Sequence, residues 1–179
     1  MNKIKRVSRR FRILFQILFY FTPVAVLWFW LSLHGPIDLF SKLGIGAALF
    51  MHPVTINGIT RILGIIVTML PAGILMYALA QLIKLFKHYE HGEIFTIDNA
   101  NRYRKLGYTL FAWVIGGLIY DALISLVMTF QNSGAGQKVV AIGVNGIDIV
   151  VIITGGLILL IAWVMKEAQK ISEEQSLTI

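Results

Sequence analysis

The chain has 179 residues and a formal net charge of +7, yet 57% of its residues are hydrophobic and only 14% are charged. An ordinary soluble domain carries about a quarter charged residues, so this composition excludes a water-facing globular exterior. The absence of cysteine excludes disulfides, thiolate metal sites and thiol catalysis.

Four apolar stretches are each close to the length that a membrane-spanning helix requires. Such a helix needs roughly 20 mostly apolar residues to cross a hydrocarbon core of about 30 Å. The predicted spans cover residues 13–33, 62–83, 106–130 and 147–165, and a tail follows over residues 166–179. We therefore expect an all-α membrane protein, built as a single bundle of four transmembrane helices. The first span is too long and too aromatic for a signal peptide, which indicates an uncleaved anchor.

The distribution of lysine and arginine predicts the orientation of the spans. Thirteen of the 16 basic residues lie before the first span, between the second and third spans, or in the tail. Basic residues concentrate on the cytoplasmic side of membrane proteins, so both termini should be cytoplasmic. The positive charge is thereby explained by topology, and we expect no direct binding of nucleic acid. Binding of anionic lipid by the basic N-terminal segment stays an alternative.

The two loops predicted on the outer side differ in character. The first, His34–Arg61, is unusually apolar. We expect it to lie on the membrane surface or to cap the bundle, and a shallow re-entrant segment is the alternative because Gly44 and Gly46 permit a tight bend. The second, Gln131–Gly146, is rich in glycine, and its centre Lys138–Val144 has the β-branched content of a short strand.

The loop between the second and third spans carries clear helix signals. Gly92 should end an extension of the second helix, and Thr96 is a good N-cap for the helix that leads into the third span. His88 and His91 have a spacing that a metal pair can use, but the pattern is not the His-Glu-x-x-His of metalloproteases. We therefore expect a solvated loop there, and neither a metal nor a cofactor.

This loop also resembles a family signature. The resemblance rests on the stretch Gly92–Thr96 (Gly-Glu-Ile-Phe-Thr), on Asn99, Arg102 and Gly107, and on the ending Glu174–Ile179. They are similar to an uncharacterised bacterial family of small four-span inner-membrane proteins, known only as a domain of unknown function. The resemblance implies a location in the bacterial cytoplasmic membrane, and it supplies no activity and no catalytic residue.

Members of that family are often encoded beside a small helix-turn-helix regulator of the Cro/C1 type. The resemblance therefore implies a link to a cytoplasmic DNA-binding partner. The candidate partner surface consists of Gly92, Phe95, Thr96, Asn99 and Arg102.

Asp121 is the only charged residue inside the third predicted span. A carboxylate at membrane depth costs a few kcal/mol on insertion scales, so it usually faces the bundle interior and has a partner. Arg61 and Lys138 are the plausible cationic partners at that level, with Lys42 further off. A structural ion pair with Arg61 is the favoured interpretation, and a proton or cation site is the alternative.

Two glycine pairs lie near the middle of the third and fourth spans, Gly116–Gly117 and Gly155–Gly156. Small residues let helix backbones approach closely in membranes, so we predict that these two helices cross at the glycine pairs. The alternative is that the glycines open a cavity for a lipid or another ligand.

Two functions from different classes follow from these features. The first is a non-enzymatic sensor or regulatory partner that acts through the cytoplasmic loop and the tail. The alternative is a small oligomeric transporter or channel, with Asp121 as an intramembrane proton or cation site. A membrane enzyme is least expected, because it would need clustered polar residues at one depth in the bilayer, and only the lone Asp121 stands out. The expected partners are membrane lipid, a cytoplasmic regulator and further copies of the chain.

Overall fold

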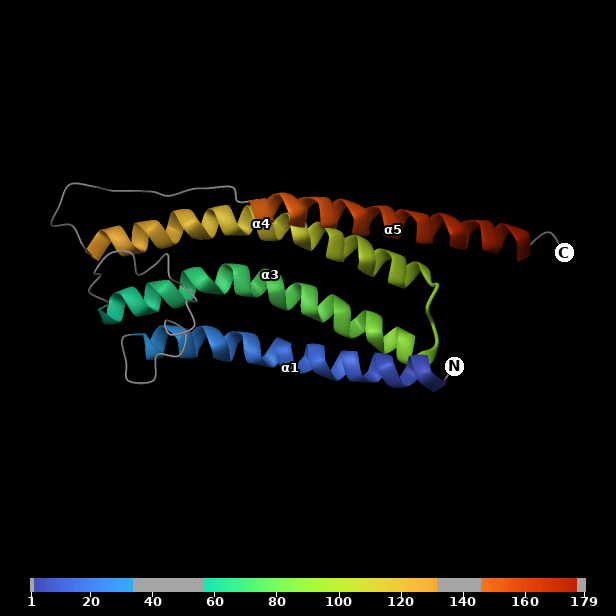
Figure 1. Ribbon diagram of the computed structural model, residues 1–179, viewed down its shortest axis with the longest axis horizontal. Coiled ribbons are helices and arrows are strands. Elements are labelled where there is room, and N and C mark those ends of the chain that lie inside the picture. The colour runs from blue at the N-terminus through green and yellow to red at the C-terminus, as the bar shows by residue number, and fades with distance from the viewer. Residues whose placement is uncertain (1, 34–56, 132–145, 177–179) are drawn as a thin grey trace. The chain divides into compact units, whose positions relative to one another are not determined.

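The computed structural model describes residues 2–33, 57–131 and 146–176, and their side chains over 3–33, 57–128 and 146–171. Within these ranges the chain forms the long helices α1 (Asn2–Ser32), α3 (Gly58–His91), α4 (Ile97–Gln131) and α5 (Gly146–Ser176), as Figure 1 shows. Most of the apolar outer loop and the short strand expected over Lys138–Val144 lie outside the described residues.

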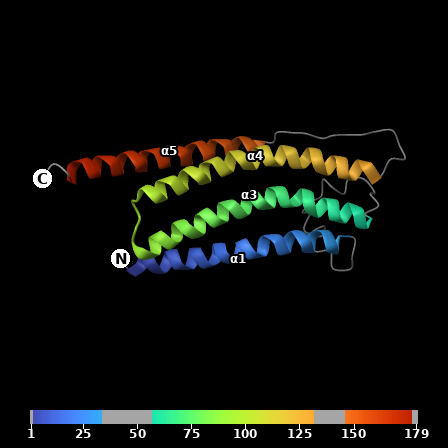
Figure 2. The same ribbon diagram turned by 180° about the vertical axis from the view of Figure 1, so that it is seen from behind.

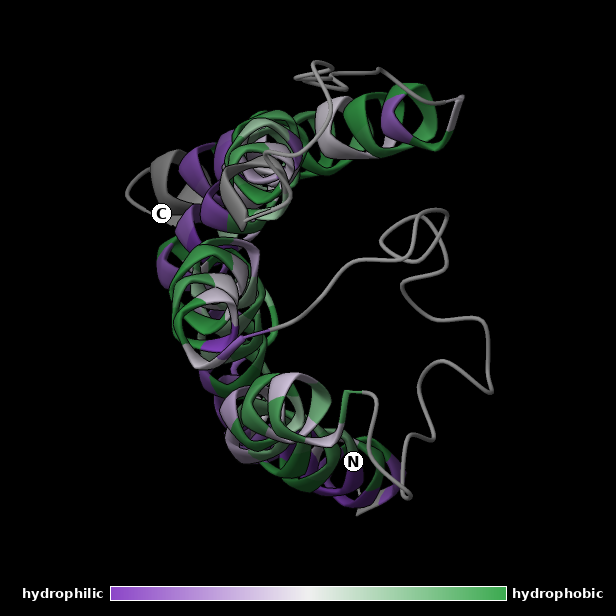
Figure 3. Cartoon of the chain, turned by 90° about the vertical axis from the view of Figure 1, so that its left-hand side faces the viewer, coloured by the Kyte–Doolittle hydropathy of each residue, from purple (hydrophilic) through white to green (hydrophobic). Residues whose placement is uncertain are grey.

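All four helices are long and apolar enough to cross a membrane, which confirms the predicted fold class. At most 17% of the residues in the most apolar window of each helix are buried within the chain. Figure 3 shows hydrophobic residues, in green, along the helices, with hydrophilic residues near the labelled chain ends. Apolar surface of this extent is stable only against lipid or another protein chain, so the molecule is an integral membrane protein.

Contacts between Cα atoms divide the chain into two compact units. The first unit comprises residues 1–20, 74–115 and 144–179, and we call it the corner unit because it contains the turn between α3 and α4. The second comprises residues 21–73 and 116–143, and we call it the Trp30 unit after its most buried large side chain.

The Trp30 unit is held by a small apolar core. Trp30, Leu33 and Ile124 are almost fully buried and pack together. The indole Nε1 of Trp30 donates a hydrogen bond of 2.9 Å to the hydroxyl of Thr68. A large aromatic ring with its polar atom satisfied is a strong packing element in an apolar environment.

Arg61 caps the end of α1 in the same unit. Its guanidinium donates hydrogen bonds to the carbonyls of Leu31, at 2.7 Å, and Leu33, at 3.0 Å. A cation at a helix C-terminus satisfies carbonyls that lack an intrahelical partner and interacts favourably with the helix dipole. This contact stabilises the C-terminal end of α1.

Candidate functional site

The candidate site is the α3–α4 corner, defined as residues His88–Tyr103. Figures 1 and 2 both show the N-terminal end of α1 beside this corner. All the residues of the predicted partner surface lie in this corner. They do not all face solvent, however, and the corner divides into a buried frame and an exposed tip.

The end of α3 is fixed by a glycine turn. Gly92 has a φ of 90°, in the left-handed region that favours glycine. Its N–H donates to the carbonyl of Tyr89, and the N–H of Glu93 donates to the carbonyl of His88, both at 3.1 Å. This pair of bonds is a Schellman motif, which stops a helix at a defined residue. The predicted helix end at Gly92 is confirmed.

The start of α4 is fixed by the predicted N-cap. The hydroxyl of Thr96 accepts a hydrogen bond of 3.3 Å from the N–H of Asn99, and its carbonyl accepts the first helical bond, from Ala100. A threonine in this position satisfies one of the free N–H groups of the first helical turn. Thr96 therefore caps α4, as predicted.

Asn99 is the centre of the frame. Its side chain is completely buried, and its Nδ2 donates to the carbonyls of Glu93, at 2.7 Å, and Ile94, at 2.9 Å. One amide thus binds two main-chain oxygens of the connecting turn. Asn99 was predicted as part of a partner surface, and the structure gives it a positioning role instead.

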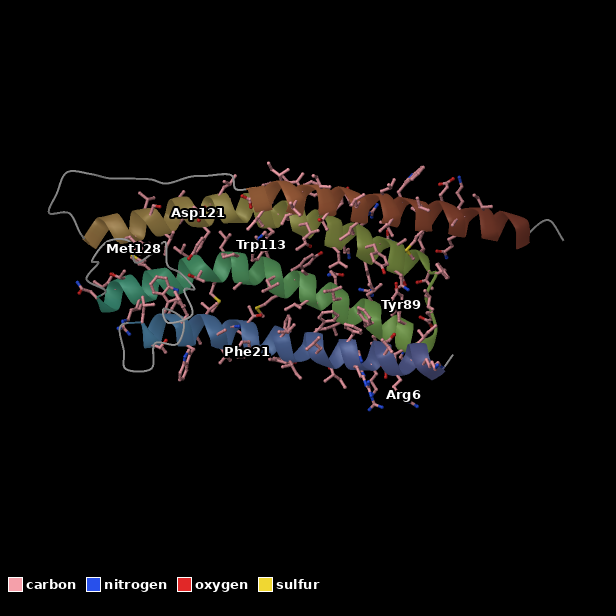
Figure 4. The ribbon with its side chains drawn as sticks, in the orientation of Figure 1. Arg6, Phe21, Tyr89, Trp113, Asp121 and Met128 are labelled. Atoms are coloured by element: carbon pink, nitrogen blue, oxygen red, sulfur yellow. The ribbon has the colours of Figure 1, made fainter. Side chains whose placement is uncertain are left out.

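A tyrosine pair closes the turn between α3 and α4. The hydroxyls of Tyr89 and Tyr103 lie 2.8 Å apart and hydrogen-bond each other. Figure 4 labels Tyr89 at the corner end of α3. Tyr89 also packs edge-on against Phe86, whose ring lies 5.4 Å from those of Phe11 and Phe15. This aromatic cluster ties α1 to α3 beneath the corner.

An ion pair joins the same two helices at the corner itself. The Nε of Arg12 lies 2.9 Å from one carboxylate oxygen of Glu90, and the Nε of Arg9 lies 4.0 Å from the other. The side chains of Arg12 and Glu90 are 26% and 23% exposed, whereas that of Arg9 is 69% exposed. The Arg12–Glu90 pair is consequently the stronger contact, because water screens the exposed cation.

The two histidines of the loop have separate contacts. The Nδ1 of His91 lies 2.8 Å from the carbonyl of Lys87, one turn back in α3. The Nδ1 of His88 lies 4.0 Å from the carboxylate of Glu93, which is an ion pair only when the histidine is protonated. Each imidazole ring therefore contacts a different residue that is close to it in the sequence.

Phe95 is the exposed tip of the corner. Its side chain is 80% exposed, the most of any large hydrophobic residue in the described part of the chain. It stands between Ile94, whose carbonyl accepts from Asn99, and Thr96, which caps α4. Arg102, the last predicted surface residue, has a buried Nε with no hydrogen-bond partner among the described residues. The corner thus carries an exposed aromatic side chain on a hydrogen-bonded frame.

Asp121 and Arg61 do not form the predicted ion pair. Arg61 donates to the carbonyls of α1, and within the described residues it makes no ion pair with Asp121. Asp121 is partly buried in α4, as labelled in Figure 4, and its carbonyl accepts a hydrogen bond of 2.6 Å from Ser125. The end of α1 offers carbonyls close to Arg61, a competing interaction that the sequence does not reveal.

The predicted crossing of α4 and α5 involves a different glycine of α4. A Cβ added at Gly155 would lie 3.3 Å from the carbonyl oxygen of Gly107, and one added at Gly107 would lie 3.2 Å from that of Gly155. The pairing of Gly155 with Gly116–Gly117 was therefore wrong. A Cβ at Gly117 or Gly156 would meet nothing within 4 Å. Close approach through small residues is confirmed for Gly155, which meets Gly107.

Fold and site together define an integral membrane protein whose described residues form four apolar helices and a hydrogen-bonded helical corner. The chain belongs to the family described as protein of unknown function (DUF2975), whose model matches residues 22–179. This membership confirms the resemblance to an uncharacterised family. Neither a curated protein nor a solved structure matches the chain.

Proposed function

We propose that the protein is a non-enzymatic sensor or regulatory partner whose α3–α4 corner docks a soluble protein on the cytoplasmic side of the bacterial inner membrane. The observation that carries this proposal is the contrast within the corner. Asn99 is completely buried and holds the turn, whereas Phe95 is 80% exposed at its tip. An aromatic side chain that is already held in place loses little entropy on binding and is a typical hot spot of protein interfaces.

The charge distribution supports the cytoplasmic side. The basic residues that flank the corner, among them Lys84, Lys87 and Lys105, follow the pattern of inner loops. The tail from Lys166 continues α5 to Ser176 and is the second polar element on the same predicted side. The corner and the tail together are the surface that we propose for the partner.

We propose a small DNA-binding regulator as that partner, since the family that the loop resembles is often encoded beside a Cro/C1-type protein. Binding to the corner would hold the regulator at the membrane, and a change in the spans would release it. In this account the membrane helices receive the signal and the corner transmits it.

Photo-cross-linking from the tip tests the proposal. A photoreactive phenylalanine analogue at position 95 should give one reproducible adduct with a soluble protein in intact cells, identified by mass spectrometry. The matched control is the same analogue at Phe21, which is 57% exposed in α1. Position 21 should cross-link to lipid or to another copy of the chain. Adducts at position 95 with lipid alone would contradict the docking role.

A small oligomeric transporter or channel is the alternative, with Asp121 as the proton or cation site. The observation that favours it is a partly buried carboxylate within an apolar span, a costly arrangement that often marks an ion pathway. Asp121→Asn should then abolish flux in proteoliposomes without changing the elution profile of the protein. An absence of flux through the wild-type protein under proton and cation gradients would contradict this alternative.

A further inference from the structure

A groove of about 250 Å³ lies between α4 and α5 in the corner unit. α4 and α5 lie side by side there in both Figures 1 and 2. The groove is lined by Ala100, Asn101, Arg104 and Tyr108 of α4 and by Leu159, Ala162, Trp163 and Lys166 of α5. Residues three or four apart in a helix share a face, so each helix presents one continuous stripe to the groove.

The charge of the groove is positive and is not compensated. Arg104 and Lys166 line it, and no acidic residue does. Neither cation forms an ion pair within the ranges that the structure describes. Asn101 adds an amide beside them. Two cations and an amide that face one space form a suitable site for a phosphate group.

The polarity of the groove changes along its length. Along α4 the lining residues change from the charged Arg104 to Tyr108. Along α5 they change from Lys166 through Trp163 to Leu159. On both helices the lining therefore runs from a charged residue toward the apolar part of the helix. Tyr108 and Trp163 are 59% and 63% exposed. Such rings are favoured at the boundary between headgroups and acyl chains, because one edge is polar and the rest apolar.

We propose that this groove binds one anionic phospholipid. The phosphodiester lies between Arg104 and Lys166, the glycerol region lies at the level of Tyr108 and Trp163, and an acyl chain follows Leu159. A zwitterionic headgroup is disfavoured, because its cationic amine would meet two further cations. A free phosphate ion would use the two cations and leave the apolar half of the groove empty. The inference goes beyond the docking function and does not depend on it.

Native mass spectrometry of the full chain in detergent tests the site directly. The protein is titrated with phosphatidylglycerol or with phosphatidylcholine of the same acyl chains, and the lipids retained on each molecule are counted. The wild-type protein should retain one phosphatidylglycerol with an apparent affinity at least about tenfold above that for phosphatidylcholine. Arg104→Gln with Lys166→Gln should remove this preference, and each single substitution should weaken it.

The matched control removes the same charge from the same helices outside the groove. Lys105→Gln with Lys170→Gln takes away two exposed cations, one beside Arg104 and one a turn beyond Lys166. This variant should keep the preference. Arg104→Lys with Lys166→Arg keeps both charges and should keep it as well. An equal loss of the phosphatidylglycerol preference in the control variant would show that net charge alone attracts the lipid. That result would overturn the groove as the binding site.

A competition arm distinguishes the lipid from a soluble phosphate. Glycerol 3-phosphate in large molar excess should not displace phosphatidylglycerol, because it lacks the chains that contact Leu159. Displacement by the soluble ester would overturn the assignment to a lipid. Equal retention of phosphatidylcholine and phosphatidylglycerol by the wild-type protein would overturn the role of the two cations.

Discussion

The corner and the Trp30 core stabilise the helices by different interactions. The corner relies on directed polar contacts, namely the Asn99 amide, the tyrosine pair and the Arg12–Glu90 ion pair. The Trp30 core relies on close packing of buried apolar side chains, with the Trp30–Thr68 hydrogen bond within it. Packing in an apolar environment fixes helices, whereas a hydrogen-bonded turn fixes the position of one exposed residue. The Trp30 core is therefore a structural region, whereas the corner is a region suited to recognition.

The largest expected effect is in the Trp30 core. Trp30→Ala should lower the free energy of unfolding in detergent by about 3 kcal/mol or more, because it leaves a cavity and removes the partner of Thr68. Thermal unfolding followed by circular dichroism measures this loss. Trp28→Ala is the control, since Trp28 is 47% exposed and should change stability by less than about 1 kcal/mol. Equal losses of unfolding free energy in the two variants would contradict the role of the buried Trp30 in packing.

An intermediate effect is expected in the frame of the corner. Asn99→Ala leaves the carbonyls of Glu93 and Ile94 without their donor and should cost about 1–3 kcal/mol. Amide hydrogen exchange over residues 92–97 should rise, while exchange in the Trp30 core stays unchanged. Asn101→Ala removes an amide that makes no such bonds and serves as the control. Unchanged exchange in Asn99→Ala would show that the amide does not hold the turn.

The smallest effect is expected at the ion pair. Glu90→Gln should lower the free energy of unfolding by less than about 1 kcal/mol at low salt, because both partners retain contact with water. The difference from wild type should shrink as salt is added. Glu93→Gln, whose side chain is 60% exposed, should have no measurable effect. A loss of stability that is unaffected by salt would indicate packing rather than charge.

Features that depend on local sequence were predicted correctly. The spans follow from apolar runs, and the ends of α3 and α4 follow from Gly92 and Thr96, because a left-handed glycine and an N-cap act within a few residues. The orientation of the termini stays a prediction. Of the predicted partner surface, Phe95 is exposed as expected, whereas Thr96 and Asn99 serve the turn.

Features that depend on the register between helices were missed. Gly107 was noted only as part of the loop signature, although it is the residue that Gly155 approaches. The contact of Arg61 with the carbonyls of Leu31 and Leu33 at the end of α1 was not expected either. The Arg12–Glu90 pair was likewise not expected, because Arg12 directly precedes the first apolar run whereas Glu90 lies seven residues past the end of the second. Sequence spacing alone does not supply the rotation of one helix against another.

The most direct measurement uses the absence of cysteine from the chain. A single Glu93→Cys variant, which keeps Phe95 and replaces an exposed side chain two residues before it, is labelled with a membrane-impermeant maleimide in inside-out vesicles, before and after peripheral proteins are stripped with carbonate. Our account predicts no labelling in intact cells, protection in untreated vesicles and full labelling in stripped ones. Labelling in intact cells, or equal labelling of treated and untreated vesicles, would contradict a cytoplasmic docking surface at the α3–α4 corner.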